Sequence, residues 1–236
     1  MEKDILGRAL LDYQNGNYVE DIVTYSSLDE KDALPLPYLF RNYHKMPILE
    51  QKALGLCHGA ILDIGCGAGG HSLYLQEKGW QVTALDRSAG AIEVCKRRGI
   101  TETVHDTLLN FTGGRFDTLL LLMNGIGIAG KLNRLDSYLE KLKSLLKPNG
   151  QILLDSSDII YMYDSDEDGG HWIPEGMDYY GEVTFTMEYK GLRSEPFNWL
   201  YVDYNTLQRA ADYHGLHCEL VSQGEHYDYL TRLSLK

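Results

Sequence analysis

Apolar runs alternate with amphipathic stretches from about residue 60 onward. The runs predict strands at 60–64, 81–85, 103–105, 118–123 and 151–154. Between them, "HSLYLQEKG" and "SAGAIEVCKRRG" predict helices, because each ends in the glycine that commonly follows a helix. Leucines at helical spacing between Leu132 and Leu146 predict a third helix, which "KPNG" would end. This order favours a doubly wound, mainly parallel α/β sheet.

Two segments lie outside that pattern. Residues 1–58 combine an amphipathic stretch near the start with the aromatic "LPLPYLFRNYHKMP", which predicts an N-terminal helical cap segment. Residues 59–236 would form the main domain, with an insertion at about 156–202. The insertion holds an acidic loop and two alternating stretches, "GEVTFTMEY" and "FNWLYV", which predict a β-hairpin. A helix at about 204–214 and strands near 217–222 and 227–235 complete the prediction.

Composition narrows the possible partners. The chain has 236 residues, and none of its apolar runs approaches the ~20 residues of a membrane span. Its first residues do not resemble a secretory signal, so we expect a cytoplasmic protein. The four cysteines form no CxxC pair, which favours reduced thiols over a disulfide or zinc site. A net charge of −12 disfavours nucleic acid and favours a small-molecule partner.

The glycine turn after the first of these strands carries the candidate chemistry. Gly65, Gly67 and Gly70 satisfy G-x-G-x-x-G between a predicted strand and a predicted helix, a pattern typical of nucleotide binding. Carboxylates follow three strands: Asp63 before the turn, then Asp86 and Asp106. Asp86 stands about 20 residues after the turn, where an acidic side chain can bind both ribose hydroxyls. The further negative charge of Asp63 and Asp106 near the turn would oppose a pyrophosphate. It would favour a ligand that carries an ammonium and a sulfonium, and S-adenosylmethionine is such a ligand.

The order of motifs resembles that of class I S-adenosylmethionine-dependent methyltransferases. The motifs are "LDIGCGAG", "VTALDRS", "HD", "FDTLLLLMNGIG" and "LKPNGQILLDSSD", within about residues 58–155. The resemblance implies a Rossmann-like seven-stranded sheet whose last strand is antiparallel. It also implies that the glycine turn holds the methionine part, Asp86 the ribose, Asp106 the adenine amino group, and the backbone at Met123 and Asn124 the methionine amine. The cofactor-binding residues so implied are Asp63, Gly65, Cys66, Gly67, Gly69, Asp86, Arg87, Asp106, Met123 and Asn124.

Catalytic residues are harder to assign. His171, beside Trp172 in the insertion, is either a general base under an aromatic wall or part of a surface loop. Tyr43 either covers the cofactor or packs in the core. We read Asp155 and Asp158 as strand-end and turn residues and predict no metal site.

We expect methyl transfer to a small molecule, with acceptor choice set by residues 156–202 and the 38–46 segment. The insertion would supply an aromatic wall of Tyr161, Tyr163, Trp172, Tyr179 and Tyr180. A non-catalytic S-adenosylmethionine-binding module and an NAD-dependent oxidoreductase are the alternatives, and the oligomeric state stays open.

Overall fold

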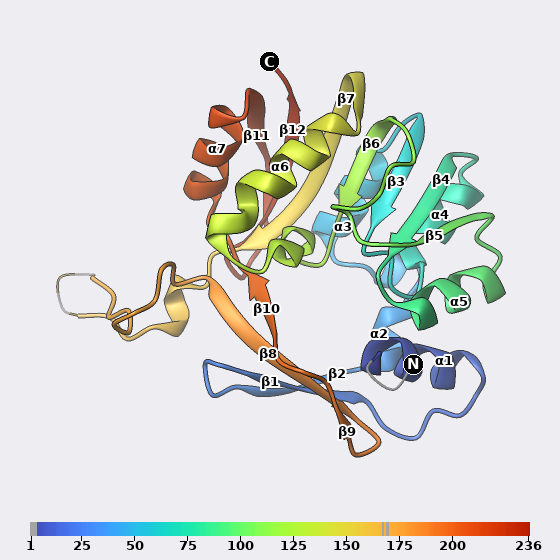
Figure 1. The fold of residues 1–236 in the computed structure, drawn as a ribbon, viewed down its shortest axis with the longest axis horizontal. Helices are drawn as coiled ribbons and strands as arrows, with labels where there is room; N and C mark the ends of the chain where they lie inside the picture. The colour runs from blue at the N-terminus through green and yellow to red at the C-terminus, as the bar shows by residue number, and fades with distance from the viewer. Residues whose placement is uncertain (1–3, 167, 169) are drawn as a thin grey trace.

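A seven-stranded core sheet organises the chain. The computed structural model describes residues 4–166, 168 and 170–236. The strand order is β11-β12-β7-β6-β3-β4-β5, parallel from β7 to β5, with β12 antiparallel to its two neighbours. The predicted fold class is therefore confirmed (Figure 1). The strands are β3 (Ala60–Ile64), β4 (Gln81–Asp86), β5 (Glu102–His105), β6 (Phe116–Leu121), β7 (Leu146–Ser157), β11 (Leu216–Gln223) and β12 (Asp228–Leu235).

Helices cover both faces of the core sheet. They are α3 (Ile48–Leu56), α4 (Gly70–Glu77), α5 (Ala89–Arg97), α6 (Leu135–Ser144) and α7 (Tyr204–Tyr213). Because side chains alternate along a strand, Leu119 and Leu121 of β6 pack in one buried cluster with α6 and α7. Leu120, between them, packs in another cluster with α3 and α4. Such a strand is apolar on both sides, which explains its continuous run of leucines.

A second, antiparallel sheet joins the N-terminal segment to the insertion; we call it the cap sheet. Its strands are β1 (Ile22–Ser26), β2 (Lys31–Leu34), β8 (Glu182–Tyr189), β9 (Leu192–Arg193) and β10 (Phe197–Leu200). Their order is β10-β8-β1-β2, with β9 paired to β8. The predicted hairpin exists as β8 and β10. The prediction of a helical N-terminal segment missed β1 and β2. These two strands form a local hairpin, and β1 also makes a long-range pairing with β8, where Val23 lies opposite Glu188.

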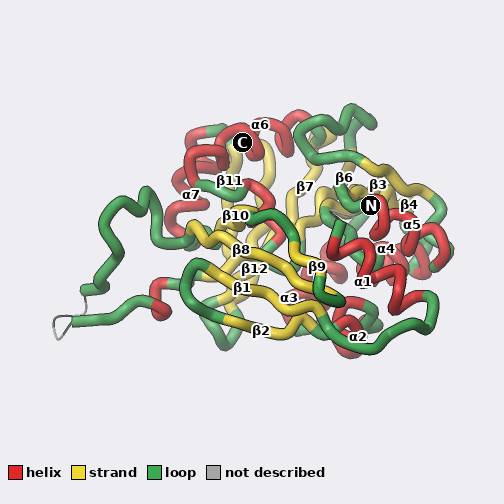
Figure 2. Tube along the Cα trace, turned by 60° about the horizontal axis from the view of Figure 1, so that its bottom comes forward, coloured by secondary structure: helices red, strands yellow, loops and turns green. Residues whose placement is uncertain are grey.

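Helix α1 (Ile5–Gln14) fixes the N-terminal segment to the core. Asp4 caps α1 by accepting a hydrogen bond from Gly7 N at 2.9 Å, and its other oxygen accepts from Ser88 Oγ at 2.8 Å and Gly90 N at 3.1 Å. One carboxylate therefore caps two helices. The backbones approach so closely that a Cβ on Gly90 would lie 2.5 Å from Gly7. This contact holds α1 beside the carboxyl end of β4, on the side of the cap sheet (Figures 1 and 2).

Several predicted boundaries were displaced. The strand predicted at 118–123 ends at Leu121, because Met123 and Asn124 adopt left-handed backbone angles, with φ of 65° and 54°. The "KPNG" stretch lies inside β7, although α6 does end shortly before it, at Ser144. The short helix α2 (Leu36–Leu39) follows β2.

Between β7 and β8, described residues of the chain form a segment that projects away from both sheets in Figure 1; we call it the projecting segment. Among the described residues, the structure contains no helix that is both long and apolar enough to cross a membrane.

Candidate active site

The glycine turn connects β3 to α4, and its first residues are hydrogen-bonded to the end of the neighbouring strand β4. Gly65 N and Cys66 N both donate hydrogen bonds to Leu85 O, at 2.8 and 3.1 Å. Gly65 and Gly67 adopt φ of 77° and 53°, which disfavour other residues. The turn therefore exposes backbone at the carboxyl edge of the sheet, where ligands bind in doubly wound folds.

Asp86 ends β4 directly beside this turn. Its Oδ2 accepts a hydrogen bond from Gly67 N at 2.9 Å, and its Oδ1 accepts one from Ser88 N at 2.8 Å. Burial raises the pKa of Asp86, and the two N–H groups act in the opposite direction. Because each carboxylate oxygen has two lone pairs, both oxygens can still accept hydrogen bonds from a ligand.

A cavity of about 360 Å³ opens at this edge; we call it the first cavity. Seven of the ten predicted cofactor-binding residues line it: Gly65, Cys66, Gly67, Asp86, Arg87, Asp106 and Met123. The other three lie elsewhere. Asp63 is buried behind the turn, where it accepts a hydrogen bond from Ser72 Oγ at 2.6 Å. Gly69 has a φ of 79°, and a Cβ there would lie 2.3 Å from the Ile100 side chain. Asn124 lines the neighbouring cavity.

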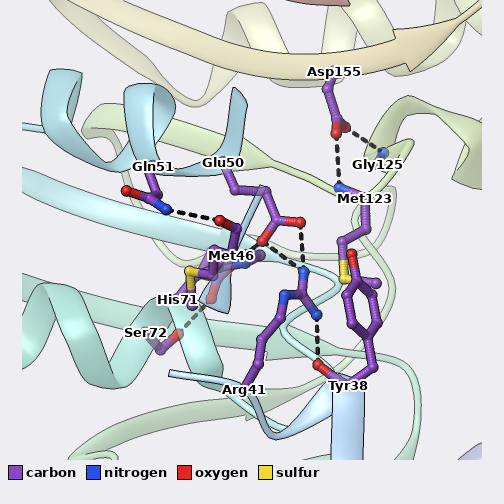
Figure 3. A network of polar contacts seen from close by, with 11 residues as sticks. Tyr38, Arg41, Met46, Glu50, Gln51, His71, Ser72, Met123, Gly125 and Asp155 are labelled. Carbon is purple, nitrogen blue, oxygen red and sulfur yellow. Dashed lines mark hydrogen bonds and ion pairs between the residues drawn. The ribbon is translucent and has the colours of Figure 1, made fainter. Parts of the chain in front are cut away.

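Sequence reasoning missed a buried charge network at the edge of the first cavity (Figure 3). Arg41 Nη2 lies 2.6 Å from Glu50 Oε2, and His71 Nε2 lies 2.8 Å from the same oxygen. Burial raises the pKa of Glu50, but His71 and Arg41 outweigh that effect and lower it. Burial lowers the pKa of His71, but Glu50 and Asp63 outweigh it and raise the pKa. Both shifts favour the charged forms of the two side chains over their neutral forms.

Arg41 and His71 both line the first cavity. Arg41 is 7% exposed, and its Nε is the one buried side-chain nitrogen or oxygen of the described residues without a hydrogen-bond partner. A buried donor left unpaired is costly, so this group is suited to an anionic ligand atom. The local sequence gives little sign of this role, because Glu50 and His71 are distant in the chain.

Asp155 fixes the backbone that follows β6. Its Oδ2 accepts a hydrogen bond from Met123 N at 3.1 Å and its Oδ1 accepts one from Gly125 N at 3.2 Å. Burial raises the pKa of Asp155 to about 7. Asp158 instead accepts hydrogen bonds from Ile160 N and Tyr180 OH. The two carboxylates thus share no hydrogen-bond partner, and each one holds a different part of the chain in place.

A second cavity, of about 610 Å³, adjoins the first. It lies between the cap sheet and residues at the ends of β7 and β12. Five residues line both cavities: Leu34, Met123, Met187, Phe197 and Trp199. We call these five residues the junction. Gly127 makes room for Trp199, since a Cβ there would lie 2.0 Å from the indole nitrogen.

Neither catalytic candidate from the sequence lies at these cavities. Tyr43 stacks on Tyr74 with ring centroids 4.1 Å apart, which is the packing alternative. His171 lies in the projecting segment, with its Nδ1 3.2 Å from Tyr163 O, and Trp172 beside it is 70% exposed. Of the five residues predicted to form an aromatic wall over the acceptor, only Tyr161 lines either cavity. Tyr161 lines the second cavity, whereas Tyr163, Tyr179 and Tyr180 pack against one another.

The sheet order and the acidic residue beside the glycine turn define a nucleotide-binding α/β protein. The family model described as a methyltransferase domain matches residues 61–150. A S-adenosylmethionine-dependent methyltransferase from Bacteroides fragilis, crystallised with S-adenosyl-L-homocysteine, is 42% identical over 99% of this chain and 95% of its own, with a TM-score of 0.92. The chain belongs to the family of S-adenosylmethionine-dependent methyltransferases. The family and the cofactor predicted from the sequence are thereby confirmed.

Curated relatives match over shorter stretches. The 2-heptyl-1-hydroxyquinolin-4(1H)-one methyltransferase of Mycobacteroides abscessus is 39% identical over 32% of this chain and 35% of its own. The ubiquinone biosynthesis O-methyltransferase of Haemophilus ducreyi is 30% identical over 45% of this chain and 48% of its own. The chain thus spans about a third to a half of the length of these relatives.

Proposed function

We propose that the protein transfers the methyl group of S-adenosylmethionine to a small-molecule acceptor and releases S-adenosylhomocysteine. The observation that carries this proposal is that the first cavity shares the five residues of the junction with a second cavity. Two substrates can therefore bind side by side, with their reacting atoms meeting at the junction.

The residues of the first cavity suit the parts of the cofactor. Asp86 would bind the ribose hydroxyls, and Asp106, whose N–H donates to Asp86 O at 3.1 Å, would lie near the adenine. The unpartnered Nε of Arg41 would bind the carboxylate of the methionine part. The backbone of Met123 and of Gly65 to Gly67 would lie along the rest of the S-adenosylmethionine molecule.

The cofactor supplies a methyl group already activated by a sulfonium, so the protein mainly has to orient the reactants and exclude water. Trp199, Phe197 and Met187 would exclude water at the junction. Asp155 would keep the Met123 backbone in position through its hydrogen bond.

Two measurements test the proposal. Calorimetric titration should detect S-adenosylmethionine binding, and acceptor screening should detect S-adenosylhomocysteine formation. Binding with no turnover on any acceptor would favour the non-catalytic module. Tight binding of NADH, followed by fluorescence, would favour the oxidoreductase.

The proposal includes a cytoplasmic location and no nucleic-acid partner. The four cysteines are free and buried, as suits a reducing compartment. The net charge of −12 opposes phosphate backbones. A tight complex with duplex DNA or structured RNA at physiological salt, seen by gel shift, would contradict this part of the proposal.

A further inference from the structure

The cap sheet presents one of its faces to the second cavity. Residues directly opposite in a sheet share a face, and the face alternates along each strand. Thr24 lies opposite both Asp32 of β2 and Met187 of β8. One step along, Ser26 lies opposite Phe185, which lies opposite Phe197 of β10. All six of these side chains line the second cavity, so this inner face forms one wall of it.

Aromatic rings cover much of this wall. Phe185 and Phe197 have ring centroids 6.1 Å apart, Phe197 and Trp199 are 6.5 Å apart, and Phe185 and Tyr201 are 6.4 Å apart. The rings form a continuous surface from Tyr201 to the junction at Trp199. Such a surface binds apolar rings or chains, and its faces attract cations.

The charged groups at the second cavity are almost all acidic. Glu30, Asp32 and Asp228 line it together with His226, and none of the described residues that line it is a lysine or an arginine. Among the ion pairs of the described residues, none involves Glu30 or Asp32. The nearby cations Lys31 and Arg193 instead lie over the ring of Tyr25. Tyr25 follows Thr24 in β1 and therefore points to the outer face of the cap sheet, away from the cavity. A negative potential therefore faces the cavity.

We propose that the second cavity binds the methyl acceptor, and that this acceptor is a small molecule with an apolar ring or chain and a positively charged amino group. The inference rests on the proposed function and gives its acceptor a chemical class. Asp32 is the residue that would select for the positive charge.

The geometry separates the charged group from the reacting atom. Leu34 belongs to the junction, and Asp32 lies two residues back along β2, which is a distance of ~7 Å. An ammonium near Asp32 has no free electron pair, so a second group, such as a hydroxyl, must react at the junction. Its oxygen forms the new bond to the methyl carbon, the carbon–sulfur bond breaks with its electrons left on sulfur, and the hydroxyl proton passes to solvent.

The test compares acceptors that differ only in charge. Tyramine, 3-(4-hydroxyphenyl)propionamide and 3-(4-hydroxyphenyl)propionate share a phenol and a two-carbon linker. Each is titrated by calorimetry into protein saturated with S-adenosylhomocysteine, and each is then supplied with S-adenosylmethionine. We expect tyramine to bind about tenfold more tightly than the propionate, and to be methylated in preference to it.

Asp32→Asn should remove most of that preference for tyramine. Asp29→Asn is the matched control, because Asp29 lies in the same hairpin but outside the lining, and asparagine tolerates its φ of 58°. The inference is overturned if the propionate binds as well as tyramine, if no compound binds at millimolar concentration, or if both variants act alike. Failure of the proposed function is a different result: no S-adenosylmethionine binds, although tyramine binds in the Asp32-dependent way.

Discussion

Arg41 and Glu50 form a buried ion pair, Nη2 to Oε2 at 2.6 Å, while Arg41 also lines the first cavity and its Nε has no hydrogen-bond partner. Arg41→Lys keeps a positive charge near Glu50 but removes this donor. We expect the dissociation constant of S-adenosylmethionine to rise about tenfold, since a hydrogen bond between charged groups contributes about 1.5–3 kcal/mol. Calorimetric titration measures it.

The exposed Arg97→Lys serves as the control for Arg41→Lys, because Arg97 pairs with Glu93 on the surface of α5. An unchanged affinity in Arg41→Lys, with the fold intact by circular dichroism, would remove Arg41 from the cofactor site.

Asp86→Ala should weaken S-adenosylmethionine binding by about 2–3 kcal/mol, the scale of charge-assisted hydrogen bonds to two hydroxyls. The structure adds a second effect, because Asp86 also accepts from Gly67 N and Ser88 N. The melting temperatures of wild type and Asp86→Ala, compared without ligand, show how much stability these two hydrogen bonds contribute. That effect can then be separated from the loss of ligand binding. If affinity is unaffected while the protein stays folded, another residue must bind the ribose.

The ion pair of His71 with Glu50 predicts a pH dependence of stability. The pKa of His71 is raised above its ordinary 6.5 by Glu50 and Asp63, against the opposing effect of burial and of Arg41. A raised histidine pKa stabilises the fold fully below pH 6.5, and this contribution is lost as the pH rises through the folded-state pKa. Wild type should therefore exceed His71→Gln in melting temperature at pH 6 by more than at pH 9.

The exposed His44→Gln provides the comparison for His71→Gln. A gap between wild type and His71→Gln that stays constant from pH 6 to pH 9 would show that the pKa of His71 is not raised in the folded protein.

The projecting segment gives a prediction opposite to the one that its sequence suggests. Its histidine and tryptophan resemble a lid, and from the sequence alone we would expect its removal to abolish methylation. The structure places His171 and Trp172 outside both cavities. Replacing residues 164–176 with a short Gly/Ser linker should leave cofactor affinity and turnover close to wild type. A loss of turnover with cofactor binding retained would show that this segment reaches the acceptor during the reaction.

The sequence was sufficient where structure is set locally. The turn at Gly65 and the carboxylate at Asp86 each follow a strand whose apolar run is evident, and strand ends converge at one edge of a parallel sheet. Both residues line the first cavity. The same reasoning assigned Asp63 to the ligand, whereas in the structure this carboxylate is buried and accepts a hydrogen bond from a neighbouring hydroxyl, that of Ser72.

Long-range contacts could not be predicted in this way. Strand β1 pairs with β8, so its role as part of a cavity wall depends on a segment from the other end of the chain. Arg41 is likewise positioned by other helices: its guanidinium pairs with Glu50 of α3, and Glu50 in turn contacts His71 of α4. Both features belong to tertiary packing, which local periodicity does not encode.

Gly127 offers the sharpest test of the junction. It lies in a 3-10 helix, Gly125–Ala129, directly against Trp199, and a Cβ there would overlap the indole at 2.0 Å from its nitrogen. Gly127→Ala must displace Trp199, which lines both cavities. We expect kcat/KM for the acceptor to fall by about tenfold or more, while S-adenosylmethionine affinity, which we attribute to Asp86 and the glycine turn, changes less.

Gly55→Ala is the matched control for Gly127→Ala. Gly55 lies within α3, and a Cβ there would have nothing within 4 Å. Alanine at that position should leave kinetics unchanged and stabilise the helix by about 0.5–1 kcal/mol. If Gly127→Ala instead weakens cofactor binding as strongly as it slows turnover, Trp199 closes the first cavity rather than the passage between the two. If neither quantity changes, the acceptor does not approach through the junction.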